Sequence, residues 1–124
     1  MSCLRVWIHL VWSTKYREKL IVPEIEKEVF EHIKENALKN DICIDCVGGG
    51  IDHVHCLIQL RAEQTIANVV NKIKGESSFW INKSQIMVPH FAWQTDYYAT
   101  SVSLCNVRRV RKYIENQKIH HKPK

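Results

Sequence analysis

Residues 48–60 read Gly-Gly-Gly-Ile-Asp-His-Val-His-Cys-Leu-Ile-Gln-Leu, and this stretch decides the fold. Successive side chains of a strand point to opposite faces, so residues 51–60 predict a strand with one continuous apolar face, formed by Val54, Cys56, Ile58 and Leu60. His53 and His55 share the opposite face. The three glycines before this strand can adopt the tight conformations of a hairpin turn. We therefore expect residues 41–47 to form the partner strand of a hairpin.

The remaining elements follow from hydrophobic spacing on either side of this hairpin. Alternation predicts a first strand, four-residue spacing predicts two helices, an aromatic and β-branched stretch predicts a last strand, and Asn106 can cap a final helix. We expect these elements over 4–13, 23–40, 65–81 and 91–104, with an irregularity near 96–98. Thr65 can cap the second helix. The order β-α-β-β-α-β predicts an α+β, ferredoxin-like antiparallel sheet with helices on one face and the other face open, plus a C-terminal helix.

Length and composition indicate one soluble domain. A chain of 124 residues has room for one core, and 45% hydrophobic with 25% charged residues is ordinary for a globular protein. The apolar stretches are far shorter than the roughly 20 residues that a membrane span needs. Five cysteines, an odd number, favour reduced thiols over a disulfide framework. We therefore expect a cytoplasmic protein with no membrane partner.

Positive charge is concentrated at the end of the chain. Residues 105–124 hold seven Lys or Arg and one Glu, a net charge of +6, whereas residues 1–104 carry a net charge of −1. Within the single predicted domain 1–124, a near-neutral sheet body (1–104) thus precedes a basic helical segment (105–124). Such a segment favours a polyanionic partner, and nucleic acid fits better than a membrane surface because no broad apolar face accompanies the charge. A solvated tail without a partner is the alternative.

The histidine pair is a candidate metal site. On a strand, the Cα atoms of His53 and His55 lie roughly 6.5 to 7 Å apart, so two imidazoles can converge on one ion. His9 lies on a neighbouring predicted strand and can share the same face. Two ordinary surface histidines on a solvent-facing sheet are the alternative interpretation of so short a pattern.

The basic helix carries a second constellation. Val107, Val110 and Ile114 fall within one arc that would pack on the body, while Tyr113 and Gln117 project together from its edge. A phenol can act as a nucleophile, and an amide oxygen can be a third metal ligand. The alternative for the tyrosine is a half-buried packing role. The basic side chains that would hold or neutralise a phosphate backbone are Arg5, Arg108, Arg109, Arg111 and Lys112.

Four stretches together resemble a known family. They are Gly50-Ile-Asp-His-Val-His-Cys-Leu-Ile58, Ile73-Lys-Gly-Glu-Ser-Ser78, Phe91-Ala-Trp-Gln94 and Tyr113-Ile-Glu-Asn-Gln117. In this order, on a β-α-β-β-α-β-α pattern, they resemble the single-tyrosine HUH transposases of the insertion-sequence 200/605 type, in the REP-associated tyrosine transposase superfamily. The resemblance covers nearly the whole chain.

The resemblance implies an enzyme that cleaves and rejoins single-stranded DNA. It implies that Tyr113 attacks a backbone phosphate to give a 5′-phosphotyrosine and a 3′-OH, and that His53, His55 and Gln117 bind a divalent ion, Mg or Mn. It also implies hairpin-containing element ends as the DNA, and a homodimer in which the tyrosine helix of one chain completes the histidine site of the other. By ligand preference alone, two imidazoles and an amide oxygen would accept Zn or Mn at least as well as Mg.

Two other functions stay open from the sequence. A non-catalytic single-stranded nucleic-acid-binding module would use the open sheet and the basic helix, with a steep salt dependence and no covalent product. A small zinc-binding domain or hydrolase would use Cys43, Cys46, His53 and His55.

Overall fold

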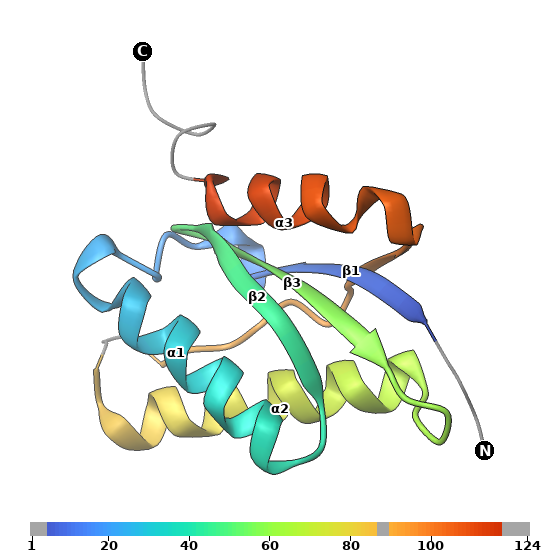
Figure 1. Cartoon of the computed structure of the whole chain (residues 1–124). Helices are drawn as coiled ribbons and strands as arrows, with labels where there is room; N and C mark the ends of the chain where they lie inside the picture. The colour runs from blue at the N-terminus through green and yellow to red at the C-terminus, as the bar shows by residue number, and fades with distance from the viewer. Residues whose placement is uncertain (1–4, 87–89, 118–124) are drawn as a thin grey trace.

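The computed structural model describes residues 5–86 and 90–117. Its elements, in order, are β1 (Val6–Ser13), η1 (Lys15–Arg17), α1 (Pro23–Lys39), β2 (Cys43–Gly50), β3 (His53–Leu60), α2 (Ile66–Ser84), β4 (Tyr98–Val102), η2 (Leu104–Asn106) and α3 (Val107–Glu115). The strands form one antiparallel sheet in the order β2-β3-β1-β4. Helices α1 and α2 lie on one face of the sheet and α3 lies on the other (Figure 1). The predicted α+β, ferredoxin-like fold with a C-terminal helix is therefore confirmed.

The main core lies between the sheet and the pair α1 and α2. The predicted inward face of β3 is confirmed, because Val54, Cys56 and Ile58 are almost fully buried. They pack with inward residues of β1 and with apolar residues of both helices, among them Leu10, Trp12, Val29, Ile33 and Val70. The alternate inward residues of the strands and the helix residues spaced by four thus pack together in one apolar layer.

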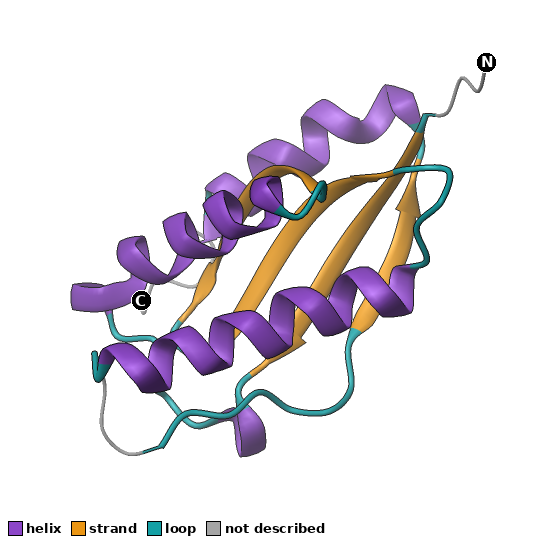
Figure 2. Cartoon of the chain, turned by 90° about the horizontal axis from the view of Figure 1, so that it is seen from below, coloured by secondary structure: helices purple, strands orange, loops and turns teal. Residues whose placement is uncertain are grey.

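The opposite face of the sheet is covered as well, which corrects the expectation of an open face. Val107 and Ile114 of α3 pack on Leu57 and Cys46 of the sheet and form a second, smaller core. Val110 is partly buried against the same cluster, as the predicted arc requires. Figure 2, turned to look from below, shows the sheet running between the helices. The tyrosine helix is therefore docked on its own sheet.

The glycine run is strand, and the expectation of a turn there was wrong. β2 continues through Gly50, Gly48 pairs with His55, and the turn falls at residues 51–52. A Cβ at Gly48 would lie 3.0 Å from Cγ2 of Ile114, inside ordinary van der Waals contact. Glycine is thus needed here because α3 approaches the strand closely.

Several element boundaries also differ from expectation. β2 begins at Cys43 because Asp41 takes a φ of 60°. The Thr65 side chain caps α2 by accepting a hydrogen bond from the Asn68 amide at 3.1 Å, as predicted. Asn106 precedes α3 without capping it, since its side-chain amide donates to Ser103 Oγ.

The last strand is shorter than its composition indicates. Within 91–104, Trp93 forms a single bridge with Thr14, and regular pairing with β1 starts at Tyr98. The chain between these points is irregular, close to the predicted position. No helix within residues 5–86 and 90–117 has the length and apolar character needed to cross a bilayer.

Candidate DNA-processing site

Three histidines meet on the α3 face of β1 and β3. His9 and His55 lie on neighbouring strands, and His9 Nε2 shares a hydrogen bond of 2.8 Å with His55 Nδ1. The rings of His53 and His55 lie 5.1 Å apart between centroids. Burial lowers the pKa of His9, which favours its neutral form. A neutral His9 therefore fixes the ring orientation of His55 without adding a positive charge.

A carboxylate orients the other histidine of the pair. Asp52 Oδ1 lies 2.9 Å from His53 Nδ1, and the Arg17 guanidinium donates to both oxygens of the same carboxylate at 3.2 and 3.3 Å. Burial acts to raise the pKa of Asp52, but the hydrogen bonds from His53 and Arg17 outweigh it and lower that pKa. An ionised Asp52 places the proton of a neutral His53 on Nδ1 and leaves Nε2 as an acceptor.

Gln117 faces that acceptor nitrogen. Its side chain is fully buried, and its amide nitrogen donates to the Tyr113 backbone carbonyl at 3.2 Å. This contact turns Oε1 toward His53, where it lies 3.4 Å from Nε2. An imidazole nitrogen and an amide oxygen thus converge, as two ligands of one cation must. The structure thus places the side-chain oxygen of Gln117 beside His53.

Tyr113 lies beside the histidines within the same chain. Its ring is edge-on to His55 at 5.7 Å and to His9 at 6.3 Å between centroids, and 42% of the residue is exposed. Together with His53 and His55 it lines a pocket of about 420 Å³, which Arg17, Asp96, Tyr97 and Tyr98 also line. A single chain therefore brings the candidate nucleophile and the two candidate histidine ligands to one solvent-accessible pocket.

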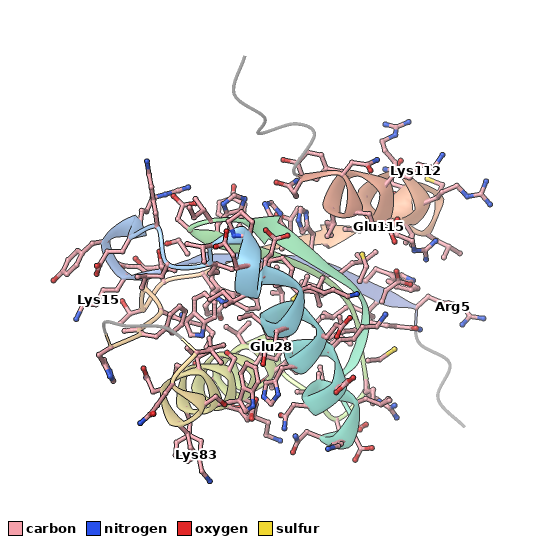
Figure 3. The ribbon with its side chains drawn as sticks, turned by 90° about the vertical axis from the view of Figure 1, so that its left-hand side faces the viewer. Arg5, Lys15, Glu28, Lys83, Lys112 and Glu115 are labelled. Carbon is pink, nitrogen blue, oxygen red and sulfur yellow. The ribbon has the colours of Figure 1, made fainter. Side chains whose placement is uncertain are left out.

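The predicted phosphate-binding residues separate into two groups. Arg5, Arg108, Arg109 and Lys112 are exposed, and Figure 3 shows Lys112 projecting from α3 away from the sheet. Arg111 instead forms a two-pronged ion pair with Asp45 of β2, with distances of 2.6 and 2.9 Å. Its guanidinium therefore ties α3 to the sheet.

The structure does not assemble the four-residue zinc site that the cysteine pattern allowed. Cys46 is buried under α3, where burial, with a smaller contribution from Asp45, raises the pKa of its thiol to about 12. Zinc needs a thiolate, so this environment is unfavourable for it. Throughout the part of the chain that the structure describes, no three His, Cys, Asp or Glu side chains are grouped to hold a metal.

Sequence reasoning missed four contributors to the pocket and to its support. Asp52 directly precedes His53, and that adjacency is a signal that could have found it. Arg17 follows β1 and lines the pocket, as does Tyr98, which pairs with β1 from β4. Asp45 of β2 contacts α3 through its ion pair with Arg111. Such long-range placements leave no local pattern in the sequence.

The paired histidines lie on a central strand of this ferredoxin-like sheet, and a tyrosine on a late helix lies beside them. The sequence model of the family described as "Transposase IS200 like" matches residues 2–117. The chain belongs to the IS200-like transposase family.

Two relatives from one bacterium agree with this assignment, and one further solved structure shares the fold. The chain is 27% identical over 114 residues to the ISDra2 transposase TnpA of Deinococcus radiodurans, covering 88% of this chain and 81% of that protein. A crystal structure of a candidate transposase from D. radiodurans R1 superposes with a TM-score of 0.74 at 25% identity, over 94% of this chain and 93% of that one. A REP-associated tyrosine transposase bound to a REP hairpin gives 0.72 at 14% identity, over 98% and 75%, and supports the fold alone.

Proposed function

We propose that this chain cleaves and rejoins single-stranded DNA through a covalent 5′-phosphotyrosine formed on Tyr113. The observation that carries the proposal is the location of the Tyr113 ring, 5.7 Å from His55 in the pocket that also holds His53. A DNA partner is further supported by the family and by the hairpin bound to one structural neighbour. The ends of the mobile element, folded as hairpins in the cytoplasm, are the proposed substrate.

In the cleavage step the Tyr113 phenol oxygen attacks a backbone phosphorus atom. The new tyrosyl O–P bond forms as the bond from phosphorus to the 3′ oxygen breaks, the phenol loses its proton, and the leaving 3′ oxygen takes one up. Attack of a 3′-OH on the phosphotyrosine reverses these changes and rejoins DNA, so the bond energy is retained without a nucleotide cofactor. Exposed Arg108, Arg109 and Lys112 on the same helix would hold neighbouring phosphates, together with Arg5.

We propose that a divalent ion binds at this site. The family resemblance implies Mg or Mn, and two imidazoles with an amide oxygen would accept Zn or Mn at least as well as Mg. His53, His55 and Gln117 would hold it, since Gln117 Oε1 and His53 Nε2 converge at 3.4 Å and Asp52 orients the imidazole. When bound, such an ion would polarise the phosphate oxygens and favour departure of the 3′ oxygen. Asp52 keeps the His53 ring aligned, and His9 does the same for His55.

We also propose that two copies associate. Helix α3 is held by a small apolar cluster and by the ion pair between Arg111 and Asp45, so exchange of α3 between two copies would recover the same contacts. A homodimer with shared active sites is therefore compatible with the packing that places Tyr113 beside the histidines of its own chain.

The test is a covalent capture assay. The protein is incubated with labelled single-stranded DNA containing an element end, with Mg or Mn, and separated on a denaturing gel. We expect a protein-linked product with the natural chain and none with Tyr113→Phe. Tyr98→Phe is the matched control, because Tyr98 is an exposed tyrosine that lines the same pocket.

Two results would contradict the proposal. An adduct that survives Tyr113→Phe would remove this residue as the nucleophile. DNA binding with a steep salt dependence but no adduct under either metal would instead indicate a non-catalytic binding module.

A further inference from the structure

A second and larger pocket, of about 980 Å³, lies between α2 and residues 90–95. We call it the α2 groove. Residues 92–94 run beside the end of β1, where the Gln94 amide donates to the Ser13 carbonyl at 2.9 Å and the Lys15 amide donates to the Ala92 carbonyl at 3.0 Å. Gln94 lines both this groove and the pocket that holds Tyr113. The two pockets therefore share one lining residue.

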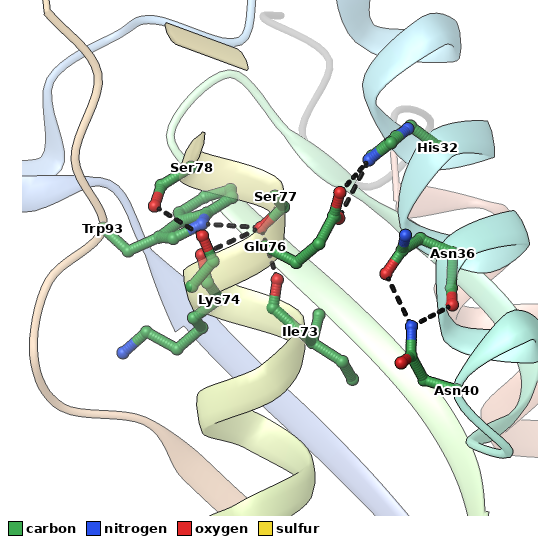
Figure 4. Close-up of polar contacts among 10 residues, drawn as sticks. His32, Asn36, Asn40, Ile73, Lys74, Glu76, Ser77, Ser78 and Trp93 are labelled. Atoms are coloured by element: carbon green, nitrogen blue, oxygen red, sulfur yellow. Dashed lines mark hydrogen bonds and ion pairs between the residues drawn. The ribbon is translucent and has the colours of Figure 1, made fainter. Parts of the chain in front are cut away.

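The wall formed by residues 91–96 is held rigidly. Asn82 of α2 makes two hydrogen bonds to the backbone of Phe91, at 2.8 and 2.9 Å. The indole of Trp93 donates to Ser77 Oγ at 2.9 Å (Figure 4), and both residues are buried. The Lys74 ammonium donates to three successive carbonyls, those of Gln94, Thr95 and Asp96. A groove whose wall is fixed in this way is preorganised to bind a ligand.

The opposite wall presents an aromatic ring and a cation to solvent. Phe79 is 65% exposed, and Lys83 Nζ stands 5.7 Å from the centroid of its ring. Figure 3 shows Lys83 at the outer surface of α2. A large apolar ring left exposed on a helix, with a lysine beside it, is suited to stacking on a flat, negatively charged partner.

The charge around the groove has one sign. Lys74 and Lys83 line it, and among the residues that the structure describes no Asp or Glu does. The carboxylate of α2, Glu76, points to the other side of the helix, where it accepts a hydrogen bond from His32 of α1 at 2.9 Å (Figure 4). The groove is thus complementary to an anion along its length.

We propose that the α2 groove binds an unpaired stretch of the DNA strand that enters the Tyr113 pocket. In this arrangement Phe79 stacks on an unpaired base and Lys83 contacts a backbone phosphate. A single strand is favoured over a duplex because stacking on an exposed ring needs a base whose face is accessible. That the same strand continues into the Tyr113 pocket rests on the proposed function, whereas binding of a single strand by the groove does not.

The experiment measures affinity for labelled oligo(dT) by fluorescence anisotropy, with a chelator present so that no cleavage occurs. Strands of about 5 and about 20 nucleotides are compared, which bracket the site size of about 4 to 16 nucleotides known for OB-fold single-strand binders. We expect Phe79→Ala to weaken binding of the long strand about 5- to 10-fold and that of the short strand less than about 2-fold. Lys83→Ala is expected to reduce the slope of log affinity against log salt by about 0.7 for the long strand.

Leu38→Ala and Lys39→Ala are the matched controls. They remove an exposed apolar side chain and an exposed lysine from the C-terminal end of α1, outside the groove. The proposal would be overturned if Phe79→Ala and Lys83→Ala changed DNA binding no more than these controls do. Losses confined to a duplex hairpin would also overturn it, because they would assign the groove to paired DNA.

This experiment distinguishes a failure of the groove proposal from a failure of the proposed strand transfer. If the natural chain forms no adduct while the length-dependent loss on Phe79→Ala is seen, the proposed strand transfer fails and the groove stands. If adducts form and the length-dependent loss is absent, the groove fails alone.

Discussion

Replacing Gly48 by alanine should displace α3 and separate Tyr113 from the histidines. The added Cβ would stand 3.0 Å from Cγ2 of Ile114 and 3.1 Å from its carbonyl carbon, and closer still to the carbonyl oxygen. Ordinary van der Waals contacts begin at 3.4 Å. Because two of the opposing atoms are backbone, side-chain rotation cannot relieve the clash, so the helix itself must move away.

The expected magnitudes follow from this contact. Overpacking of this kind costs about 1 to 3 kcal/mol of the free energy of unfolding. The main core does not include α3, so the chain can relieve the strain by loosening the helix while the sheet and the other two helices stay folded. A displacement of about 1 Å at a reacting group can lower a rate about 100-fold. We therefore expect a small loss of stability and a large loss of adduct formation.

Gly75→Ala is the matched control because the same methyl group is added in open space. An added Cβ at this exposed position of α2 meets no atom within 4 Å. Alanine is favoured over glycine inside a helix by about 0.5 to 1 kcal/mol, so this variant should be more stable than the natural chain. Urea denaturation measures both stabilities, and hydrogen exchange of the α3 amides measures the docking of the helix.

The reasoning would be refuted if Gly48→Ala kept the natural rate of adduct formation and the natural protection of the α3 amides. Equal losses of adduct formation in both glycine variants would also contradict it, since only one of them faces α3. A variant that unfolds completely would show that α3 cannot loosen independently of the main core, against the expected behaviour.

Two further substitutions test the support around the pocket. Asp52→Asn should weaken binding of Mn²⁺ about 10- to 100-fold by titration calorimetry, because the carboxylate that aligns His53 is lost; unchanged affinity would argue against this role. Arg109→Ala should reduce the salt slope of single-strand binding by about 0.7 without changing the urea midpoint. Arg111→Ala should lower that midpoint, because Asp45 loses its partner. If Arg109→Ala lowered the midpoint and Arg111→Ala reduced the salt slope instead, the DNA-binding role and the structural role would belong to the opposite arginines.

Local patterns predicted most of the fold. Alternation along β3 predicted which side of the strand faces the main core, and Thr65 was recognised as a cap, because each depends on neighbours within one element. The glycine run was misassigned for a physical reason. Glycines occur both in turns and where two backbones pack closely. Here the close contact is with Ile114, which lies far along the chain and leaves no local pattern near the glycines.

The candidate site was predictable only in part. His53, His55, Tyr113 and Gln117 were found from spacing and resemblance, and the structure brings them together in one chain. The ion pair that ties Arg111 to Asp45 was not predicted, because it joins β2 to α3 across 66 residues of sequence. Residues that orient others depend on tertiary contacts that no local pattern encodes.

The glycines just before the histidine motif connect the fold to the chemistry. Gly48 allows the backbone of α3 to settle on β2, which brings Tyr113 to the pocket. A Cβ at Gly50 would lie 2.7 Å from Cε1 of His53, so glycine there leaves room for the ring that Asp52 orients. The helix that carries Tyr113 needs a strand without a side chain at Gly48, and the His53 ring needs the same at Gly50. The strand beside the histidines is therefore without side chains at the points where the helix and the ring approach it.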